Sequence, residues 1–92
     1  MTVDRYAGFR EFLLARGLTL SRTAYLLAGN HAAAEDLMQT ALAKTARHWP
    51  RVRAGGNPEG YVRRVLVNEH ISQWRRHRER EWPMAQLPVH PS

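Results

Sequence analysis

Residues 57–80 read NPEGYVRRVLVNEHISQWRRHRER, and this stretch predicts one long helix that becomes more basic toward its end. Asn57 is a favourable N-cap, Pro58 suits the first helical position, and Glu59 lies where the helix dipole favours an acidic group. Apolar side chains then recur at helical spacing, while arginines and polar residues take the remaining surface. We therefore expect one face that packs and another that can meet phosphate. Arginines can also merely solvate a helix end, and the helix alone does not exclude that alternative.

Three further helices are predicted upstream from the spacing of apolar residues. The first should run from Asp4 to Arg16 and end at Gly17, and a second should cover residues 18–29. Asn30 should cap a third helix over residues 31–49.

The whole chain is predicted to be all α, because no segment alternates as a strand would. Pro50 should end the third helix, and residues 51–57 should form a loop before the final helix begins. The four helices would pack as a compact bundle. Its predicted core consists of Phe9, Leu13, Tyr25, Leu37, Leu42, Trp49, Val62 and Leu66.

Composition bounds the architecture and the kind of partner. A chain of 92 residues with 43% hydrophobic content suits one small domain, which we place at residues 1–80, followed by a Pro-containing linker or tail at 81–92. The formal charge is +6, and residues 47–80 carry nine basic and three acidic groups. Such an excess favours nucleic acid as a partner over an anionic membrane surface.

The same sequence indicates where the protein works. It has no cysteine, no apolar run of membrane-spanning length and no secretory h-region. We expect a cytoplasmic protein that neither enters a membrane nor depends on disulfides.

An enzyme is not expected. Glu35 and Asp36 are adjacent and therefore point in different directions on a helix, which is poor geometry for a cooperating acid and base. His70 and His77 are two turns apart, too far for one metal ion. No nucleophile elbow or phosphate-binding glycine motif is present. The sequence therefore predicts no catalytic residue, metal, cofactor or small-molecule substrate.

A polar stripe on the third helix is a second candidate surface. Its members, spaced by three and four, are Asp36, Gln39, Thr40, Ala43 and Arg47. Periodicity alone leaves open whether this face meets a partner or only solvent.

Two segments together carry a specific resemblance. AEDLMQTALAKTARHW at 34–49, followed by a loop and then NPEGYVRRVLVNEHISQWRRHR, resembles region two of the extracytoplasmic-function sigma factors of bacterial RNA polymerase, within them the actinobacterial, sigma-E-like group. FREF at 9–12 and RTAYLLAG at 22–29 fit the same style, so the resemblance covers about residues 6–80.

This resemblance implies partners and roles for both surfaces. The stripe on the third helix lies where the family docks on the clamp helices of the polymerase β′ subunit, and an anti-sigma factor is a further partner to consider. The following loop and last helix lie where the family melts the −10 promoter element and captures a base of the non-template strand. Asn68 matches an amide position of the base-reading helix, whereas Ser72 stands where Asn or Asp is more usual. The predicted DNA-binding residues are Arg51, Arg53, Asn57, Tyr61, Arg63, Arg64, Asn68, Ser72, Arg75, Arg76 and Arg78.

Several alternatives stay open at this point. Tyr61 could offer an aromatic face to a base or pack in the core, whereas Trp49 and Trp74 fit core or capping contacts better than stacking. Residues 81–92 fall where the family has a linker, and the helix-turn-helix that reads the −35 element is not part of this sequence. We therefore expect either one domain of a longer protein or a truncated product. The leading hypothesis is a promoter-recognition domain of transcription initiation. Its rivals are a decoy that occupies the polymerase clamp without opening DNA and a generic duplex-binding domain.

Overall fold

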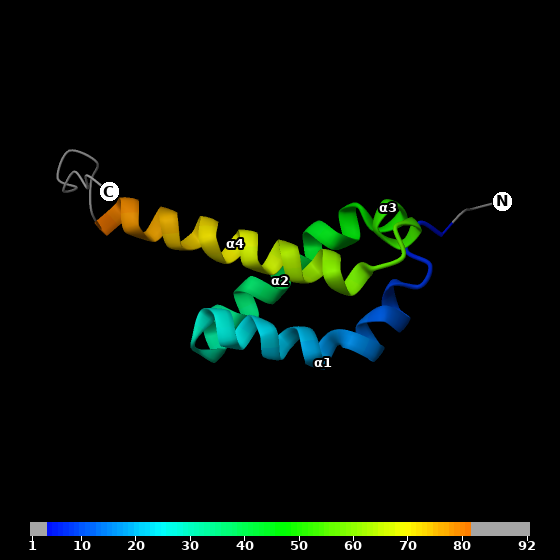
Figure 1. Ribbon diagram of the computed structural model, residues 1–92, viewed down its shortest axis with the longest axis horizontal. Coiled ribbons are helices and arrows are strands. Elements are labelled where there is room, and N and C mark those ends of the chain that lie inside the picture. The colour runs from blue at the N-terminus through cyan, green and yellow to red at the C-terminus, as the bar shows by residue number, and fades with distance from the viewer. Residues whose placement is uncertain (1–3, 82–92) are drawn as a thin grey trace.

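The computed structural model describes residues 4–81, and every regular element in that range is a helix (Figure 1). The four helices are α1 (Phe9–Ala28), α2 (His31–Arg47), α3 (Trp49–Ala54) and α4 (Pro58–Glu81). The all-α prediction is therefore confirmed. No helix within residues 4–81 is both long and apolar enough to cross a membrane.

Three long helices build the bundle and the short one closes an end of it. α1, α2 and α4 pack against one another pairwise, and α3 contacts both α2 and α4. Figure 1 shows the second half of α4 projecting well beyond the other helices. Residues of the predicted tail from 82 onward lie outside the described residues, and α4 itself extends to Glu81.

The predicted break at Gly17 is wrong, because α1 runs through this residue without interruption. A glycine inside a helix costs only about 1 kcal/mol relative to alanine. Packing offsets this cost, since Phe12 precedes Gly17, Leu20 and Ala24 follow it, and all three are buried. The real break comes at Gly29, whose φ of +86° suits glycine and whose N–H donates to the carbonyl of Tyr25 at 2.8 Å.

The predicted loop after Pro50 is partly wrong. α2 ends at Arg47, and Trp49 and Pro50 begin the separate helix α3, so that only residues 55–57 remain as a loop. Proline is tolerated in the first turn of a helix because the N–H that it lacks would have no intrahelical partner there. Trp49 and Val52 both bury their side chains, which gives this short helix a packed side.

Both predicted asparagine caps are confirmed. The side-chain oxygen of Asn30 accepts the Ala33 N–H at 2.9 Å, and that of Asn57 accepts the Gly60 N–H at 3.0 Å. These bonds satisfy backbone donors that the first turn of a helix leaves without partners. They place the starts of α2 and α4 at the predicted residues.

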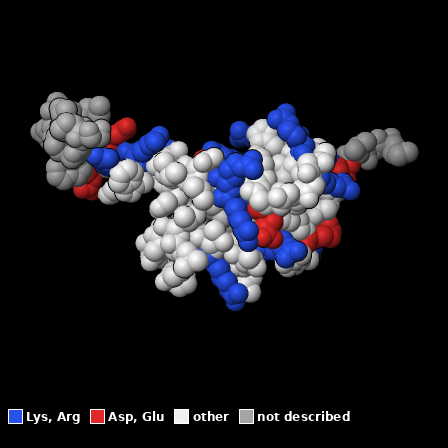
Figure 2. All heavy atoms as spheres, in the orientation of Figure 1, with Lys and Arg blue, Asp and Glu red and all other residues white. Residues whose placement is uncertain are grey.

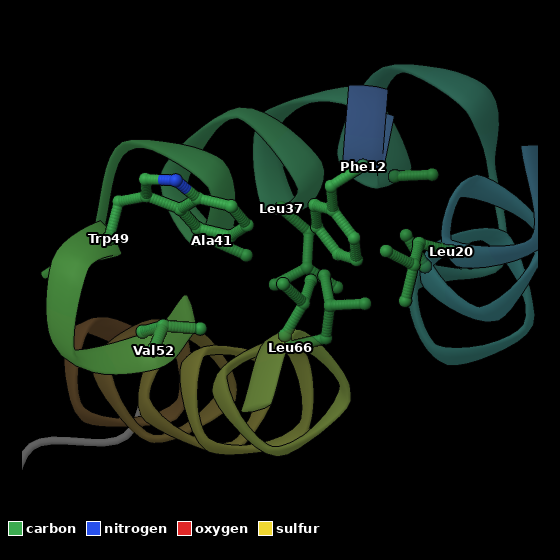
Figure 3. Packing of buried hydrophobic residues seen from close by; sticks show 10 residues of the cluster. Phe12, Leu20, Leu37, Ala41, Trp49, Val52 and Leu66 are labelled. Carbon is green, nitrogen blue, oxygen red and sulfur yellow. The ribbon is translucent and has the colours of Figure 1, made fainter. Parts of the chain in front are cut away.

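The core forms where α1, α2 and α4 meet. Figure 3 shows Phe12, Leu20, Leu37 and Leu66 converging from these helices, with Trp49 and Val52 nearer α3. The Trp49 ring lies 5.0 Å from that of Phe9.

The predicted core is largely correct. Leu37, Trp49, Val62 and Leu66 are buried, and Phe9, Leu13 and Leu42 are half-buried. Tyr25 is the exception, because it is 41% exposed and lies against the His31 ring instead. The prediction also omitted Leu20, which is fully buried.

Candidate nucleic-acid interface

A surface hollow lies where the end of α2, α3 and the start of α4 meet. Its volume is about 380 Å³. Val52 is buried and Tyr61 is half-buried, so these two side chains form its floor. The other lining residues are exposed and form its rim: His48, Arg51, Gly55, Asn57 and Arg64.

Local backbone structure fixes the positions of the rim residues. The His48 carbonyl accepts the N–H groups of Arg51 and Val52, both at 3.0 Å, and this ties the junction of α2 and α3 to the first turn of α3. Gly56 then adopts a φ of +80°, which lets the chain turn toward the start of α4. Asn57 lines the hollow and also uses its side-chain oxygen as the cap of α4.

The hollow continues into a polar stripe along α4, which we call the α4 stripe. Its members follow Tyr61 at spacings of three and four residues, which places them on one face of the helix. Arg64 and Asn68 are exposed, Ser72 is half-buried, and Arg75 is exposed on the projecting part. The fold thus brings together most of the predicted DNA-binding residues: Arg51, Asn57, Tyr61, Arg64, Asn68, Ser72 and Arg75.

Arg63 and Arg53, two of the predicted arginines, point elsewhere. Arg63 forms an ion pair with Glu59 at 2.7 Å, and Arg16 of α1 contacts the same carboxylate at 3.3 Å. Arg63 therefore lies on the α1 side of α4. The side chain of Arg53 lies about 3.8 Å from where a Cβ on Gly8 would be, beside the N-terminal turn.

Arg76 and Arg78 are exposed on the projecting end of α4. The Arg78 guanidinium lies over the ring of Trp74, 5.2 Å from its centroid. Figure 2 shows cationic side chains over the middle of α4 and again on its projecting end.

The predicted polymerase-binding stripe lies on the outer face of α2, and we call it the α2 stripe. Asp36, Gln39, Ala43 and Arg47 are exposed and Thr40 is half-buried. The opposite face of the helix carries the buried residues Ala34, Leu37, Ala41 and Thr45.

One ion pair joins the two candidate surfaces. The Lys44 ammonium group of α2 binds the Glu69 carboxylate of α4, whose side chain is only 11% exposed. This pair therefore links α2 to α4.

Sequence reasoning missed two features of this surface. His48 lines the hollow, but a histidine at a helix end carries no sequence signal until α3 folds back beside α4. The second feature is an apolar groove of about 710 Å³ between α1 and α2, which Gln39 borders. Two leucines of this groove, Leu18 and Leu26, are exposed, and sequence reasoning did not single them out. Figure 2 shows that the lobe around the end of α1 carries few charged side chains.

Comparisons with known proteins identify the family of this chain. Residues 15–80 match the family described as Sigma-70 region 2. The chain is 36% identical over 83 residues to the RNA polymerase sigma-E factor of Streptomyces coelicolor, an alignment that covers 90% of this chain and 47% of that protein. It is 35% identical over 80 residues to the sigma-E factor of Streptomyces avermitilis, covering 87% and 45%.

The chain thus spans about half the length of these curated relatives, and no solved structure matched it significantly. Sigma factors are not enzymes, in agreement with the sequence prediction. The matches confirm the resemblance drawn from the sequence. This chain belongs to the sigma-70 region 2 family.

Proposed function

We propose that this chain works in transcription initiation as a region 2 domain that docks on the β′ clamp helices of RNA polymerase and holds the melted −10 element in the cytoplasm. The observation that carries the proposal is the continuous surface formed by the hollow and the α4 stripe. It combines an apolar and aromatic floor, cationic groups at the rim and an exposed carboxamide at Asn68. Those are the groups that an unstacked base and its backbone require.

The hollow suits an unstacked base of the non-template strand. Taking a base out of the stack costs a few kcal/mol, which the protein must return by new contacts. Stacking on an aromatic side chain returns about 1 to 3 kcal/mol per base. Tyr61 is half-buried, so its ring can stay fixed by the protein on one side and meet a base on the other. This geometry favours the stacking role for Tyr61 without removing its packing role.

Asn68 and Ser72 extend the site beyond the hollow. Each lies one helical turn further along the α4 stripe, where a strand leaving the hollow would pass. The Asn68 carboxamide offers both donors and an acceptor to a base edge, whereas the Ser72 hydroxyl is shorter and half-buried. Asn68 is therefore the residue that we expect to read a base directly.

We expect Arg64→Ala to weaken single-strand binding at low salt and to reduce the salt dependence by about one unit of slope, because one phosphate contact is lost. Arg63→Ala is a matched control, since the neighbouring guanidinium pairs with Glu59 on the other side of the helix. Binding of a fluorescent −10 single strand to the chain, measured by anisotropy over a range of salt concentrations, compares them. Equal slopes for the two variants would remove Arg64 from the proposed phosphate path.

The α2 stripe is the proposed contact with the polymerase. Asp36→Ala combined with Gln39→Ala should weaken binding to a β′ clamp-helix fragment at least about threefold, while helix content stays unchanged because exposed substitutions rarely cost stability. Glu11→Ala, an exposed carboxylate lost from α1, is the control. Titration by calorimetry would settle the matter, and undiminished binding by the double variant would exclude this face.

A further inference from the structure

His48 is a residue of the hollow to which the proposed function so far assigns no role. It lies between α2 and α3, and its exposed side chain borders the hollow beside Arg51 and Arg64. Its backbone is held by three hydrogen bonds: its N–H donates to the Thr45 carbonyl at 3.2 Å, and its own carbonyl accepts the N–H groups of Arg51 and Val52. These bonds fix the position of the His48 backbone, and the imidazole extends from that position at the rim of the hollow.

The charges around the hollow favour an anion at the rim. Arg51 comes from α3 and Arg64 from α4, and the neighbouring Arg47 of α2 is exposed. Within residues 4–81, Tyr61 and His48 are the remaining titratable side chains of the lining, and no lining residue in that range carries a carboxylate. Val52 is buried and Tyr61 is half-buried, whereas the cationic side chains of the rim are exposed. A nucleotide fits this division if its base enters and its phosphate stays at the rim.

We propose that His48 binds the phosphate of the nucleotide whose base occupies the hollow. The proposal rests on the proposed function, because it requires that a strand enters this hollow. It adds a contact from the α2–α3 junction, which would hold the nucleotide from the side opposite α4. The imidazolium form donates two hydrogen bonds and carries a positive charge, so it binds a phosphate more strongly than the neutral ring does.

This contact has a signature that an arginine cannot produce. Histidine is the side chain that changes its charge between about pH 8 and about pH 6. Arginine side chains keep their charge throughout that range, and tyrosine stays neutral. Affinity for a −10 single strand should therefore rise by up to about fivefold as the pH falls, the range that one exposed charged contact supplies.

The experiment measures anisotropy of a fluorescent −10 single strand bound to the 92-residue chain, at about pH 8 and about pH 6 and at constant ionic strength. Three variants are compared with the unmodified chain. His48→Gln keeps a hydrogen-bond donor but does not titrate, and His48→Lys carries a charge at both pH values. His70→Gln removes a histidine of α4 that does not line the hollow.

We expect His48→Gln to bind weakly at both pH values, His48→Lys to bind tightly at both, and His70→Gln to keep the pH dependence. A pH response that persists in His48→Gln would overturn the proposal. A second series of strands separates a failure of the His48 proposal from a failure of the proposed function. Each strand carries one abasic site, at a different position of the −10 element. If no abasic site weakens binding, the hollow takes no base and both proposals fail. If one abasic site weakens binding but His48→Gln titrates normally, only the role of His48 is lost.

Discussion

Replacing Leu37 by alanine is expected to lower the free energy of unfolding by about 2 to 5 kcal/mol. Leu37 is fully buried at the centre of the bundle, where Figure 3 shows it between Phe12 of α1 and Leu66 of α4. The substitution removes apolar contacts and leaves a cavity that three helices cannot easily close. Domains of this size are stable by only about 5 to 15 kcal/mol, so the loss is a large share of the total.

Denaturant titration followed by circular dichroism measures this effect. Leu26→Ala is the matched control, because the same atoms are removed from a side chain that is 83% exposed, and we expect a change below about 0.5 kcal/mol. Leu42→Ala should fall between the two, since this leucine is half-buried at the edge of the apolar groove. If Leu37→Ala lowers the free energy of unfolding no more than Leu26→Ala does, Leu37 does not belong to the core.

The fold class could be predicted because helical periodicity is a local property of the sequence. Asn30 and Asn57 marked the starts of α2 and α4 correctly, since a side-chain cap depends only on the next three residues. Gly17 misled the prediction, because a glycine ends a helix only when packing does not outweigh its cost. That balance depends on the partners of Leu20 and Ala24 in α2 and α4, which the local sequence does not reveal.

Helix α3 was missed for a similar reason. Pro50 is a helix breaker in an interior position but acceptable in a first turn, and the sequence allows either placement. What decides is the tertiary contact of Trp49, whose indole N–H donates to the Ala7 carbonyl at 2.7 Å and whose ring packs against Phe9 and Phe12. These contacts hold Trp49 against the start of α1 and the residues just before it. Residues 49–54 therefore form the separate short helix α3.

In the candidate site, too, the features that depend on neighbouring residues could be predicted from the sequence, whereas those that depend on tertiary packing could not. The spacing of Tyr61, Arg64 and Asn68 places them on one face of α4, because a helix fixes the angle between residues three and four apart. The helix and these residues were predicted from the sequence, but this face was not separated from the one that carries Arg63. Charge alone was a poorer guide. Arg63 matches Arg64 in type and differs by one position, yet it pairs with Glu59 on the opposite side. The hollow itself joins residues from three helices, so His48 could be found only once α3 was seen beside α4.

Asn68→Ala is expected to reduce binding of the preferred −10 sequence by about 1 to 3 kcal/mol and to leave other sequences nearly unchanged. The carboxamide is exposed on the α4 stripe, one turn beyond Arg64, where it can bond to a base edge. Its loss leaves that edge without a partner, a penalty that depends on the base and not on the phosphate. The salt dependence should therefore stay unchanged, in contrast to that of Arg64→Ala.

The measurement is a strand-binding series with the chain bound to the polymerase core, in which each −10 base is varied at several salt concentrations. Val67→Ala serves as the control, because Val67 neighbours Asn68, is 41% exposed and points away from the α4 stripe. Ser72→Asn should shift the base preference further, since it restores a carboxamide one turn along from Asn68. If Asn68→Ala weakens the binding of every sequence equally, Asn68 contributes only to general affinity. In that case α4 contacts only the sugar-phosphate backbone of the strand and reads no base.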